Sequence, residues 1–323
     1  MKIYHVHQGL THKTFSELAE QIDTCRWDGN TLQANTSEIK FKSYYYNELQ
    51  GLNWAVNEFW AEEDVLLKDI QGEQQSIFIR FIKDETLYYQ QGIKSIGKGN
   101  VQGVCMYNYP QTIDMLIPAH KSVKWIGVSI NAHLWKQLTH NRFPELDGLI
   151  FSKKKWIIYE SLSIQMENYI SDIFSAQNVG IGRIGLTLGS GLLLLTFFFQ
   201  EIYKRRKEKN NIGTLTADAD LLFAIKDDLQ SHLSEPPSIE ELMKKYGMSE
   251  TRLRINFKKM FGMPPRQFVL RERYREAYRQ INQTDKSIID IAYSLGFANK
   301  GHFSNGFKKE FGISPSQLRT RKI

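Results

Sequence analysis

PSIEELMKKYGMSETRLRINFKKMFGMPPRQF, at residues 237–268, is repeated with changes as KSIIDIAYSLGFANKGHFSNGFKKEFGISPSQL, at residues 286–318. The Phe-Lys-Lys at 257–259 recurs fifty residues later at 307–309, and the Phe-Gly at 261–262 recurs with it. Such internal repetition predicts one supersecondary unit that is used twice.

Each copy begins like a capped helix. Ser238 is followed three residues later by Glu241, which is the spacing of a capping box, and Ser287 repeats this arrangement with Asp290. Apolar residues then recur at helical spacing. Each copy is therefore expected to start with a short amphipathic helix.

A glycine ends this first helix in both copies, Gly247 in one and Gly296 in the other, because glycine adopts the left-handed conformation without strain. A second helix is expected to begin at Ser249 and near Asn299. The arrangement is that of a helix-turn-helix, whose second helix enters the DNA major groove. The duplication argues against two unrelated helical hairpins and predicts helix-turn-helix units at 238–262 and 287–312.

The second copy also carries a family signature: Ser287-Ile288, Ala292-Tyr293, Gly296-Phe297, His302-Phe303-Ser304, Phe307-Lys308-Lys309 and Phe311-Gly312-Ile313-Ser314-Pro315. It resembles the AraC/XylS family of bacterial transcription regulators, over roughly the last ninety residues. The resemblance implies a linking helix at 265–282. Eighteen residues at 1.5 Å each span about 27 Å, which with the flanking units approaches one DNA turn of about 34 Å. Two recognition helices would then reach successive major grooves on one face of promoter DNA.

The resemblance also implies which side chains contact DNA. Base-reading positions are Thr251, Arg252, Arg254 and Ile255 in the first unit, and Lys300, Gly301, His302, Ser304 and Asn305 in the second. Candidate phosphate contacts are Lys258, Lys259, Arg271, Arg273, Arg275, Lys308 and Lys309. The family often has arginine where Asn305 stands, and Gly301 and Gly306 weaken the helix. The second unit is therefore expected to hold mainly the DNA backbone.

Charge is distributed unevenly along the 323 residues. Residues 204–323 hold 24 basic and 14 acidic side chains, whereas the whole chain has a net charge of +7. A basic C-terminal part is typical of a phosphate-binding module. The start of the chain lacks the apolar segment of a signal peptide, and Cys25 and Cys105 have no CxxC spacing, so we expect a reducing cytoplasm.

Residues 1–150 are expected to form a β-rich ligand-sensing domain. Short runs rich in β-branched and aromatic residues lie at 39–46, 52–59, 76–82, 100–107, 112–117 and 123–130. They favour a small barrel or jelly roll, and regulators with this C-terminal signature often carry a cupin-like sensor here. Candidate effector-binding residues are Trp54, Arg80, Tyr107 and Trp125. The alternative is that these aromatics are core residues and that Arg80 is solvated.

Residues 151–206 are expected to be helical, with Trp156 to Gln177 as one helix. Residues 184–199 carry no charge, which raises the alternative of a membrane span, but the segment is shorter than about twenty residues. We expect instead a buried helix that forms a homodimer, followed by a linker at 207–217 and the DNA-binding domain at 218–323. His5 and His7 form an HxH pair without a cluster that completes a metal site.

The sequence thus predicts an α+β multidomain protein: a cytoplasmic transcription regulator, expected to be an activator. Its expected partners are double-stranded promoter DNA, RNA polymerase and a small-molecule effector, with a ferric siderophore as one guess. No cofactor and no membrane association are expected. Two alternatives stay open: an architectural DNA-binding protein without a ligand, and a DNA-repair alkyltransferase, which would need a reactive cysteine.

Overall fold

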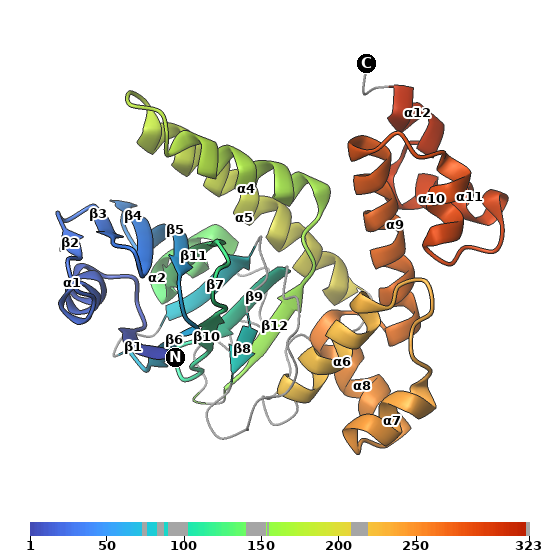
Figure 1. Cartoon of the computed structure of the whole chain (residues 1–323), viewed down its shortest axis with the longest axis horizontal. Coiled ribbons are helices and arrows are strands. Elements are labelled where there is room, and N and C mark those ends of the chain that lie inside the picture. The colour runs from blue at the N-terminus through green and yellow to red at the C-terminus, as the bar shows by residue number, and fades with distance from the viewer. Residues whose placement is uncertain are drawn as a thin grey trace. The chain divides into compact units, whose positions relative to one another are not determined.

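The computed structural model describes residues 1–72, 76–82, 87–89, 103–139, 153, 155–207 and 219–320. The chain divides into two compact units, Met1–Phe223 and Ala224–Ile323. The first unit is built from β-strands with helices on them, and the second is helical throughout its described part (Figure 1).

Two sheets form the first unit. The smaller sheet has the strand order β1 (Lys2–His7), β6 (Val65–Ile70), β10 (Asp114–Ile117), β8 (Leu87–Tyr89). The larger sheet has the order β12 (Ile157–Glu160), β9 (Gly103–Asn108), β7 (Ser76–Ile82), β11 (Val123–Asn131), β5 (Leu52–Ala61), β4 (Ile39–Leu49), β3 (Thr31–Asn35), β2 (Arg26–Trp27).

Each of the six predicted β-rich runs contains a strand, namely β4, β5, β7, β9, β10 and β11. The start of the run at 100–107 lies outside the described residues. Pairing is antiparallel except between β1 and β6, which run parallel with Lys2 opposite Val65. The sequence patterns did not indicate β1, β2, β3, β6, β8 or β12, most of which are short.

Alternation along the strands divides the larger sheet into two buried faces. Phe41, Phe59 and Trp125 share a core with Leu67 and Met115 of the smaller sheet, so the two sheets pack face to face. This arrangement places the inner core of the unit between the sheets.

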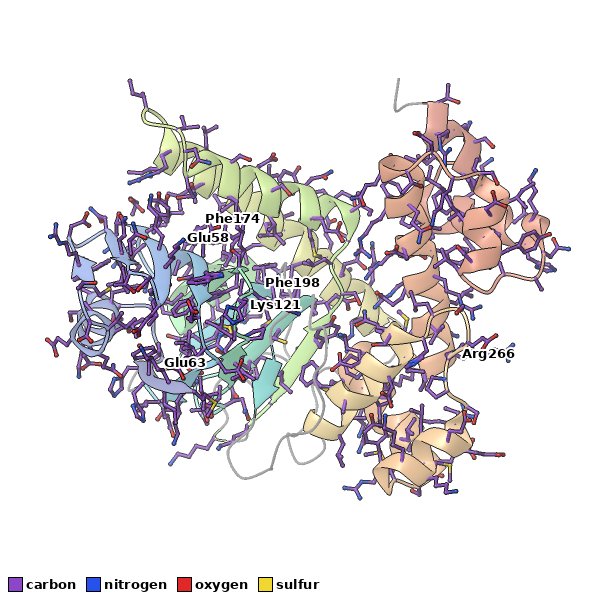
Figure 2. The ribbon with its side chains drawn as sticks, in the orientation of Figure 1. Glu58, Glu63, Lys121, Phe174, Phe198 and Arg266 are labelled. Carbon is purple, nitrogen blue, oxygen red and sulfur yellow. The ribbon has the colours of Figure 1, made fainter. Side chains whose placement is uncertain are left out.

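The other face of the larger sheet is covered by helices. Ile79 and Phe81 of β7 pack there with α2 (Ala132–Thr139), α4 (Ile164–Ala176) and α5 (Arg183–Lys207). The two longer helices lie side by side (Figure 1). Phe198 of α5, labelled in Figure 2, meets the ring of Phe81 at 5.8 Å between centroids.

Two details of this helical region correct the sequence-based prediction. The apolar run at 157–160 is not helical but is strand β12, which pairs with β9 at the edge of the sheet. The helix α4 begins only at Ile164, where Ser163 caps it by accepting a hydrogen bond from the Met166 backbone N–H. Within the described residues, one helical segment, Arg183–Arg205, is long and apolar enough to cross a membrane by length and composition.

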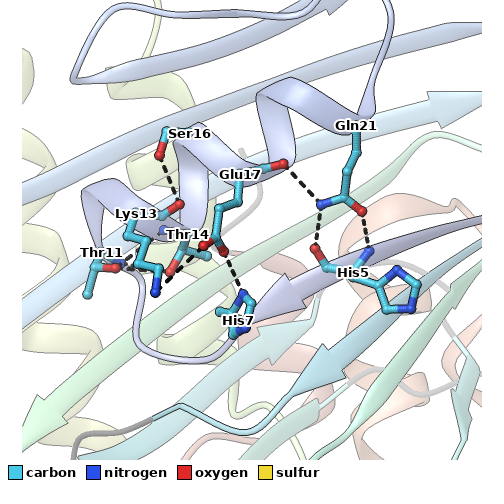
Figure 3. Close-up of polar contacts among 8 residues, drawn as sticks. All are labelled: His5, His7, Thr11, Lys13, Thr14, Ser16, Glu17 and Gln21. Carbon is cyan, nitrogen blue, oxygen red and sulfur yellow. Dashed lines mark hydrogen bonds and ion pairs between the residues drawn. The ribbon is translucent and has the colours of Figure 1, made fainter.

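A short helix, α1 (His12–Gln21), lies beside β1 and is tied to it by side chains (Figure 3). The Gln21 amide donates to the carbonyl oxygen of His5 at 2.8 Å and accepts from the His5 backbone N–H at 2.7 Å. His7 Nδ1 contacts Glu17 Oε2 at 2.5 Å. These contacts hold α1 against the edge of the smaller sheet.

The second unit is organised around one long helix, α9 (Pro265–Gln283), which connects two helical groups (Figure 1). The first group contains α6 (Ala219–Ser231), which belongs to this unit from Ala224 onward, together with α7 (Ile239–Tyr246) and α8 (Glu250–Phe261). The second contains α10 (Ile288–Ser294), α11 (Lys300–Phe311) and α12 (Pro315–Thr320).

The predicted caps and turns of both groups are confirmed. Ser238 and Glu241 form the reciprocal capping box, and the Ser287 hydroxyl accepts from the Asp290 backbone N–H at 3.0 Å. Gly247 and Gly296 have φ of +61° and +79°, in the left-handed region that favours glycine.

Candidate nucleic-acid interface and effector cavity

The second helix of the first unit, α8, separates a buried face from a polar one. Leu253, Phe257 and Met260 are buried in the core. The predicted base-reading residues Thr251, Arg252, Arg254 and Ile255 are all exposed, as is Lys258, whereas Lys259 is half-buried. Ile255 is 48% exposed, which leaves an apolar side chain on this face that could meet a thymine methyl group.

One of these exposed cations is already oriented. Arg254 Nε contacts Glu250 Oε1 at 2.6 Å, one helical turn away, and both side chains are about half exposed. Ion pairs on the surface of a helix contribute about 0.3 to 0.5 kcal/mol, so a stronger partner can displace this one. The pair therefore orients the guanidinium, which can still exchange Glu250 for another partner.

The second unit presents a similar face on α11. Phe303 and Phe307 are buried, whereas Lys300, Gly301, His302, Asn305, Lys308 and Lys309 are exposed and Ser304 is half-buried. The Asn299 side chain caps the helix by accepting from the backbone N–H groups of Gly301 and His302, at 2.7 and 3.2 Å.

The second glycine of α11, Gly306, has a packing role that its sequence neighbours do not indicate. A Cβ atom at this position would collide with the phenol oxygen of Tyr274 on α9. Tyr274 itself packs on Phe297 and Phe303. The glycine therefore lets α9 and α11 approach closely, although glycine has a low helix propensity.

Arg273, one of the predicted phosphate contacts, already has partners within the domain. Its guanidinium donates to three backbone carbonyl oxygens, those of Leu233 at 2.6 Å, Gly296 at 3.0 Å and Ser234 at 3.1 Å. Burial also lowers its pKa from the ordinary value. Arg273 thus joins the segment after α6 to the turn of the second helix-turn-helix.

Arg275 and Arg271 both contact a carboxylate inside the domain, that of Glu272. Arg275 is 5% exposed and contacts Glu272 at 3.2 Å, and Arg271 Nε lies 3.9 Å from the same carboxylate. Gln230 of α6 also donates to Glu272, at 2.9 Å. Burial opposes ionisation of Glu272, but the two guanidinium groups hold its pKa below the ordinary value. Both predicted phosphate contacts therefore already have a carboxylate partner inside the domain, where Arg275 is buried and Arg271 is half-buried.

Arg266, which the sequence analysis did not select, lies in the first turn of α9, and its side chain is exposed (Figure 2). The positive end of the helix dipole adds to its charge at this position. The signal that could have found it is its place directly after Pro265, where a helix begins.

In the first unit, three of the four predicted effector-binding residues gather around one cavity. Arg80, Tyr107 and Trp125 line a space of about 80 Å³ between the two sheets. Trp54 does not, because alternation along β5 turns it to the opposite face. There its ring lies against α5, where a Cβ added at Gly191 would be only 2.8 Å from it.

A buried ion pair lies in the wall of this cavity. Arg80 Nη2 is 3.2 Å from Asp69 Oδ2, and Arg80 Nη1 donates to the carbonyl oxygen of Ile113 at 2.7 Å. The Arg80 guanidinium also lies over the Tyr107 ring, 5.5 Å from its centroid. Burial raises the pKa of Asp69 and of Tyr107 above their ordinary values, and Arg80 opposes both shifts.

Neither cysteine has the surroundings of a nucleophile. Cys105 is fully buried in β9, and burial raises the pKa of the half-buried Cys25 thiol. Within the described residues, no three His, Cys, Asp or Glu side chains gather closely enough to hold a metal ion.

Comparison with known proteins concerns the C-terminal unit. A family model described as a helix-turn-helix domain matches residues 242–321. The HTH-type transcriptional activator RhaS of Yersinia pestis (strain Pestoides F) is 36% identical over 100 residues, which are 31% of this chain and 37% of the relative. RhaS of Y. pestis bv. Antiqua (strain Antiqua) is 35% identical over the same length. The match thus spans little more than a third of these relatives.

Among solved structures, an AraC-type regulator from Chromobacterium violaceum is 27% identical, with a TM-score of 0.31 over 33% of this chain and 96% of that one. The DNA-binding domain of AdpA, solved with a target DNA, is 25% identical, with a TM-score of 0.29 over 31% and 90% of the two chains. ToxT from Vibrio cholerae is 14% identical, with a TM-score of 0.32 over 84% and 98%.

Two helix-turn-helix groups on one connecting helix, with polar second helices, define the second unit as a double helix-turn-helix DNA-binding domain. This unit is similar to the helix-turn-helix family model over residues 242–321 and to part of the HTH-type transcriptional activator RhaS.

Proposed function

We propose that this chain is a sequence-specific DNA-binding transcription activator in which a small molecule bound between the two sheets alters how the C-terminal unit engages promoter DNA. The observation that carries the proposal is the pair of exposed polar faces on α8 and α11, presented by helices whose other sides are buried. The activating direction follows the name of the RhaS relatives.

In this proposal α8 reads bases and α11 contributes less. Arg254 and Arg252 have the donor geometry for guanine, and Ile255 and Thr251 offer methyl groups to thymine. On α11 the exposed positions hold Lys300, Gly301, His302 and Asn305, with Ser304 half-buried. These side chains are shorter or less specific, and Lys308 and Lys309 fit contact with the sugar-phosphate backbone.

We propose phosphate contacts for the first helix-turn-helix that differ in part from those predicted from the sequence. Lys258 and Lys259 stay in it, and Arg266 replaces the arginines at 271, 273 and 275, whose side chains are engaged inside the domain. The 19 residues of α9 span about 28 Å, which together with the flanking groups suits two successive major grooves.

The homodimer is proposed to form along α5. Its outward stripe is apolar or small, with Gly185, Gly189, Leu192, Leu193 and Thr196 all exposed at helical spacing. The opposite stripe, which includes Leu194 and Phe198, is buried on the larger sheet. An exposed apolar stripe of this length is costly in water and is typical of a self-association surface. The same pairing would account for the apolar composition of α5 in a cytoplasmic protein.

The β-rich unit is proposed to be a cupin-like effector domain, since its two sheets face each other around the cavity. RNA polymerase is the proposed partner at the promoter. An alkyltransferase activity is disfavoured, because one thiol is buried and the other has a raised pKa.

The test is selection from a randomised 40-base-pair duplex library with the full chain, followed by footprinting on the enriched sequence. We expect one enriched motif and protection of two segments about one helical turn apart, on one face of the duplex. Binding without any enriched motif would favour the architectural alternative and contradict the proposal.

A further inference from the structure

A polar groove lies on the helix-bearing face of the larger sheet, beyond the part that the helices bury. We propose that this groove binds a free nucleoside monophosphate, with the base on Trp60 and the phosphate at Lys40 and Lys42. The groove is on the opposite face of the sheet from the cavity between the two sheets. The inference therefore adds a second ligand site to the proposed function and does not depend on it.

Strand register shows where the buried part of this face ends. One cross-strand row is packed into the core shared with α4 and α5, and it consists of Tyr44, Val56 and Ile126. Two residues before this row on β4, Lys42 is exposed and lies opposite Glu58 on β5. Two residues earlier still, Lys40 is exposed and lies opposite Trp60. The sheet thus places two lysines, a carboxylate and an indole ring next to each other on one face.

The groove has the volume of a small-molecule site. It measures about 370 Å³, and such sites usually enclose roughly 300 to 1,000 Å³. Its lining includes Gln33 and Asn35, which are exposed on β3 opposite Lys42 and Lys40. The cavity between the sheets encloses about 80 Å³. Of the two, the groove is the one with room for a molecule that has both a ring system and a phosphate group.

Charge complementarity favours a doubly negative ligand. Within the described residues, Lys40 and Lys42 have no carboxylate partner, and each lies over an aromatic ring, at 5.2 and 4.8 Å from its centroid. Glu58, labelled in Figure 2, is paired with Lys124 at 3.0 Å. Three lysines and one glutamate leave a net charge of +2, and a phosphate monoester carries about −1.5 to −2 at neutral pH.

Both unpaired lysines can reach the same phosphate group. Lys40 and Lys42 are two residues apart on one strand, so their Cα atoms are about 7 Å apart and their side chains leave the same face of the sheet. A lysine ammonium is a mobile point charge on a flexible stem, and it binds phosphate in this form. The pair therefore suits a single phosphate monoester.

Trp60 supplies the contact for a base. It lines the groove and is half-buried, and Lys40 lies over its ring. Such a contact between a cation and a ring is weak at an exposed site, so the ammonium can turn to a phosphate and leave the ring face to a base. Bases stack on aromatic side chains whatever their identity. The amides of Gln33 and Asn35 offer donors and acceptors to the edge of the base.

The experiment measures binding to the full chain by isothermal titration, without DNA, at about 0.15 M salt. The probes are the 5′-monophosphates of adenosine, guanosine, cytidine and uridine, and the comparisons are the matching nucleosides and inorganic phosphate. We expect at least one mononucleotide to bind saturably at one per chain. Its affinity should be at least about tenfold tighter than that of its nucleoside and that of inorganic phosphate.

Three variants locate the site. Lys42→Glu should abolish mononucleotide binding, because it reverses a charge that faces the phosphate. Trp60→Leu should bring the affinities for the mononucleotide and for inorganic phosphate to within about twofold of each other, because the stacking contact is lost. Lys13→Glu makes the same change of charge at a lysine of α1 whose side chain is 71% exposed, and as the control it should leave binding unchanged.

Nucleosides that bind as tightly as the mononucleotides would overturn the role of the lysines, and inorganic phosphate that binds as tightly would overturn the role of Trp60. Absence of saturable binding by all four mononucleotides, or binding that Lys42→Glu leaves unchanged, would overturn the proposal as a whole. A single strand of about ten nucleotides that Lys42→Glu weakens, with no mononucleotide bound, would mean that the groove holds nucleic acid instead. DNA selection with the same preparation keeps a failure here distinct from a failure of the proposed function.

Discussion

The guanidinium of Arg273 donates from Nη1 to the carbonyl oxygen of Gly296 at 3.0 Å, and Nε and Nη2 of the same group hold the carbonyl oxygens of Leu233 and Ser234. The glycine carbonyl belongs to the turn of the second helix-turn-helix, and the other two follow α6. One side chain of the connecting helix therefore fixes both halves of the DNA-binding unit to each other.

Arg273→Lys should lower the free energy of unfolding by about 2 to 4 kcal/mol, because a lysine ammonium cannot reach three carbonyl groups in the fork geometry of arginine. Urea unfolding followed by circular dichroism measures this loss. A phosphate contact would behave differently: the variant would keep its stability and show a smaller dependence of DNA affinity on salt.

Glu272→Gln tests the buried charge cluster through pH. In the unaltered chain the pKa of Glu272 is lower when folded than its ordinary value of 4.5, because of Arg275 and Arg271 acting against burial. The unfolded chain therefore takes up a proton first as the pH falls below 4.5. The contribution of Glu272 to stability is full above that pH and is lost toward the folded pKa.

We expect the difference in unfolding free energy between the unaltered chain and Glu272→Gln to shrink as the pH is lowered from 6 through 4.5. Chemical denaturation at a series of pH values gives this difference directly. A difference that stays constant with pH would mean that the two arginines do not stabilise the ionised carboxylate.

Arg254→Ala and Lys258→Ala should separate base reading from backbone contact. Loss of the arginine should cost about 1 to 3 kcal/mol of binding free energy and relax the preference at one base pair. Loss of the lysine should weaken binding to all sequences alike and reduce the slope of log affinity against log salt by about one. Gel-shift titration on the selected duplex and on single-base variants distinguishes the two patterns.

Gly306→Ala should destabilise the C-terminal unit although alanine is the better helix former by about 1 kcal/mol. The reason is the contact with Tyr274, whose phenol group occupies the space that a methyl group would need. Gly301→Ala is the matched control in the same helix, since the nearest atom to its added Cβ is the Asn299 side-chain oxygen at 3.1 Å. Thermal unfolding of both variants should rank Gly306→Ala as clearly the less stable.

Leu193→Glu should convert the proposed dimer to a monomer by placing a charge in the middle of the apolar stripe of α5. Sedimentation velocity at micromolar concentration reports the mass. Ile181→Glu serves as the control, because Ile181 is 95% exposed in the connection before α5 and outside the stripe. If the two variants sediment alike, another surface forms the dimer or the chain is monomeric.

The DNA-binding unit was predictable because its signals are local. A helix start is indicated by Ser238 with Glu241, and its end by Gly247, all within ten residues. The repeat carries the same two signals again. The exposed face of α8 followed from helical spacing alone. By contrast, the roles of Arg273 and Gly306 depend on partners about 20 to 40 residues away, which no local pattern encodes.

The β-rich unit was predictable only in part for a related reason. Strands such as β7 are buried on both faces, so their runs of apolar residues do not show which side faces the cavity. Trp54 and Trp125 both lie in runs with strand-like composition, yet of the two Trp125 lines the cavity and Trp54 does not. The strand β12 was merged with the helix after it, because Ile157 to Tyr159 are apolar and continue the helical spacing of α4.

Trp54 packs so closely on Gly191 that no residue with a side chain fits at this position of α5. The helix therefore cannot shift along its sequence relative to the sheet. Inserting a single residue between Arg183 and Gly191 would rotate everything before the insertion by about 100° relative to the rest of the helix. The outward stripe would then no longer run continuously along one side. Substitutions in this part of the chain should therefore be tolerated better than insertions, whereas the connection before Arg183 should accept changes in length.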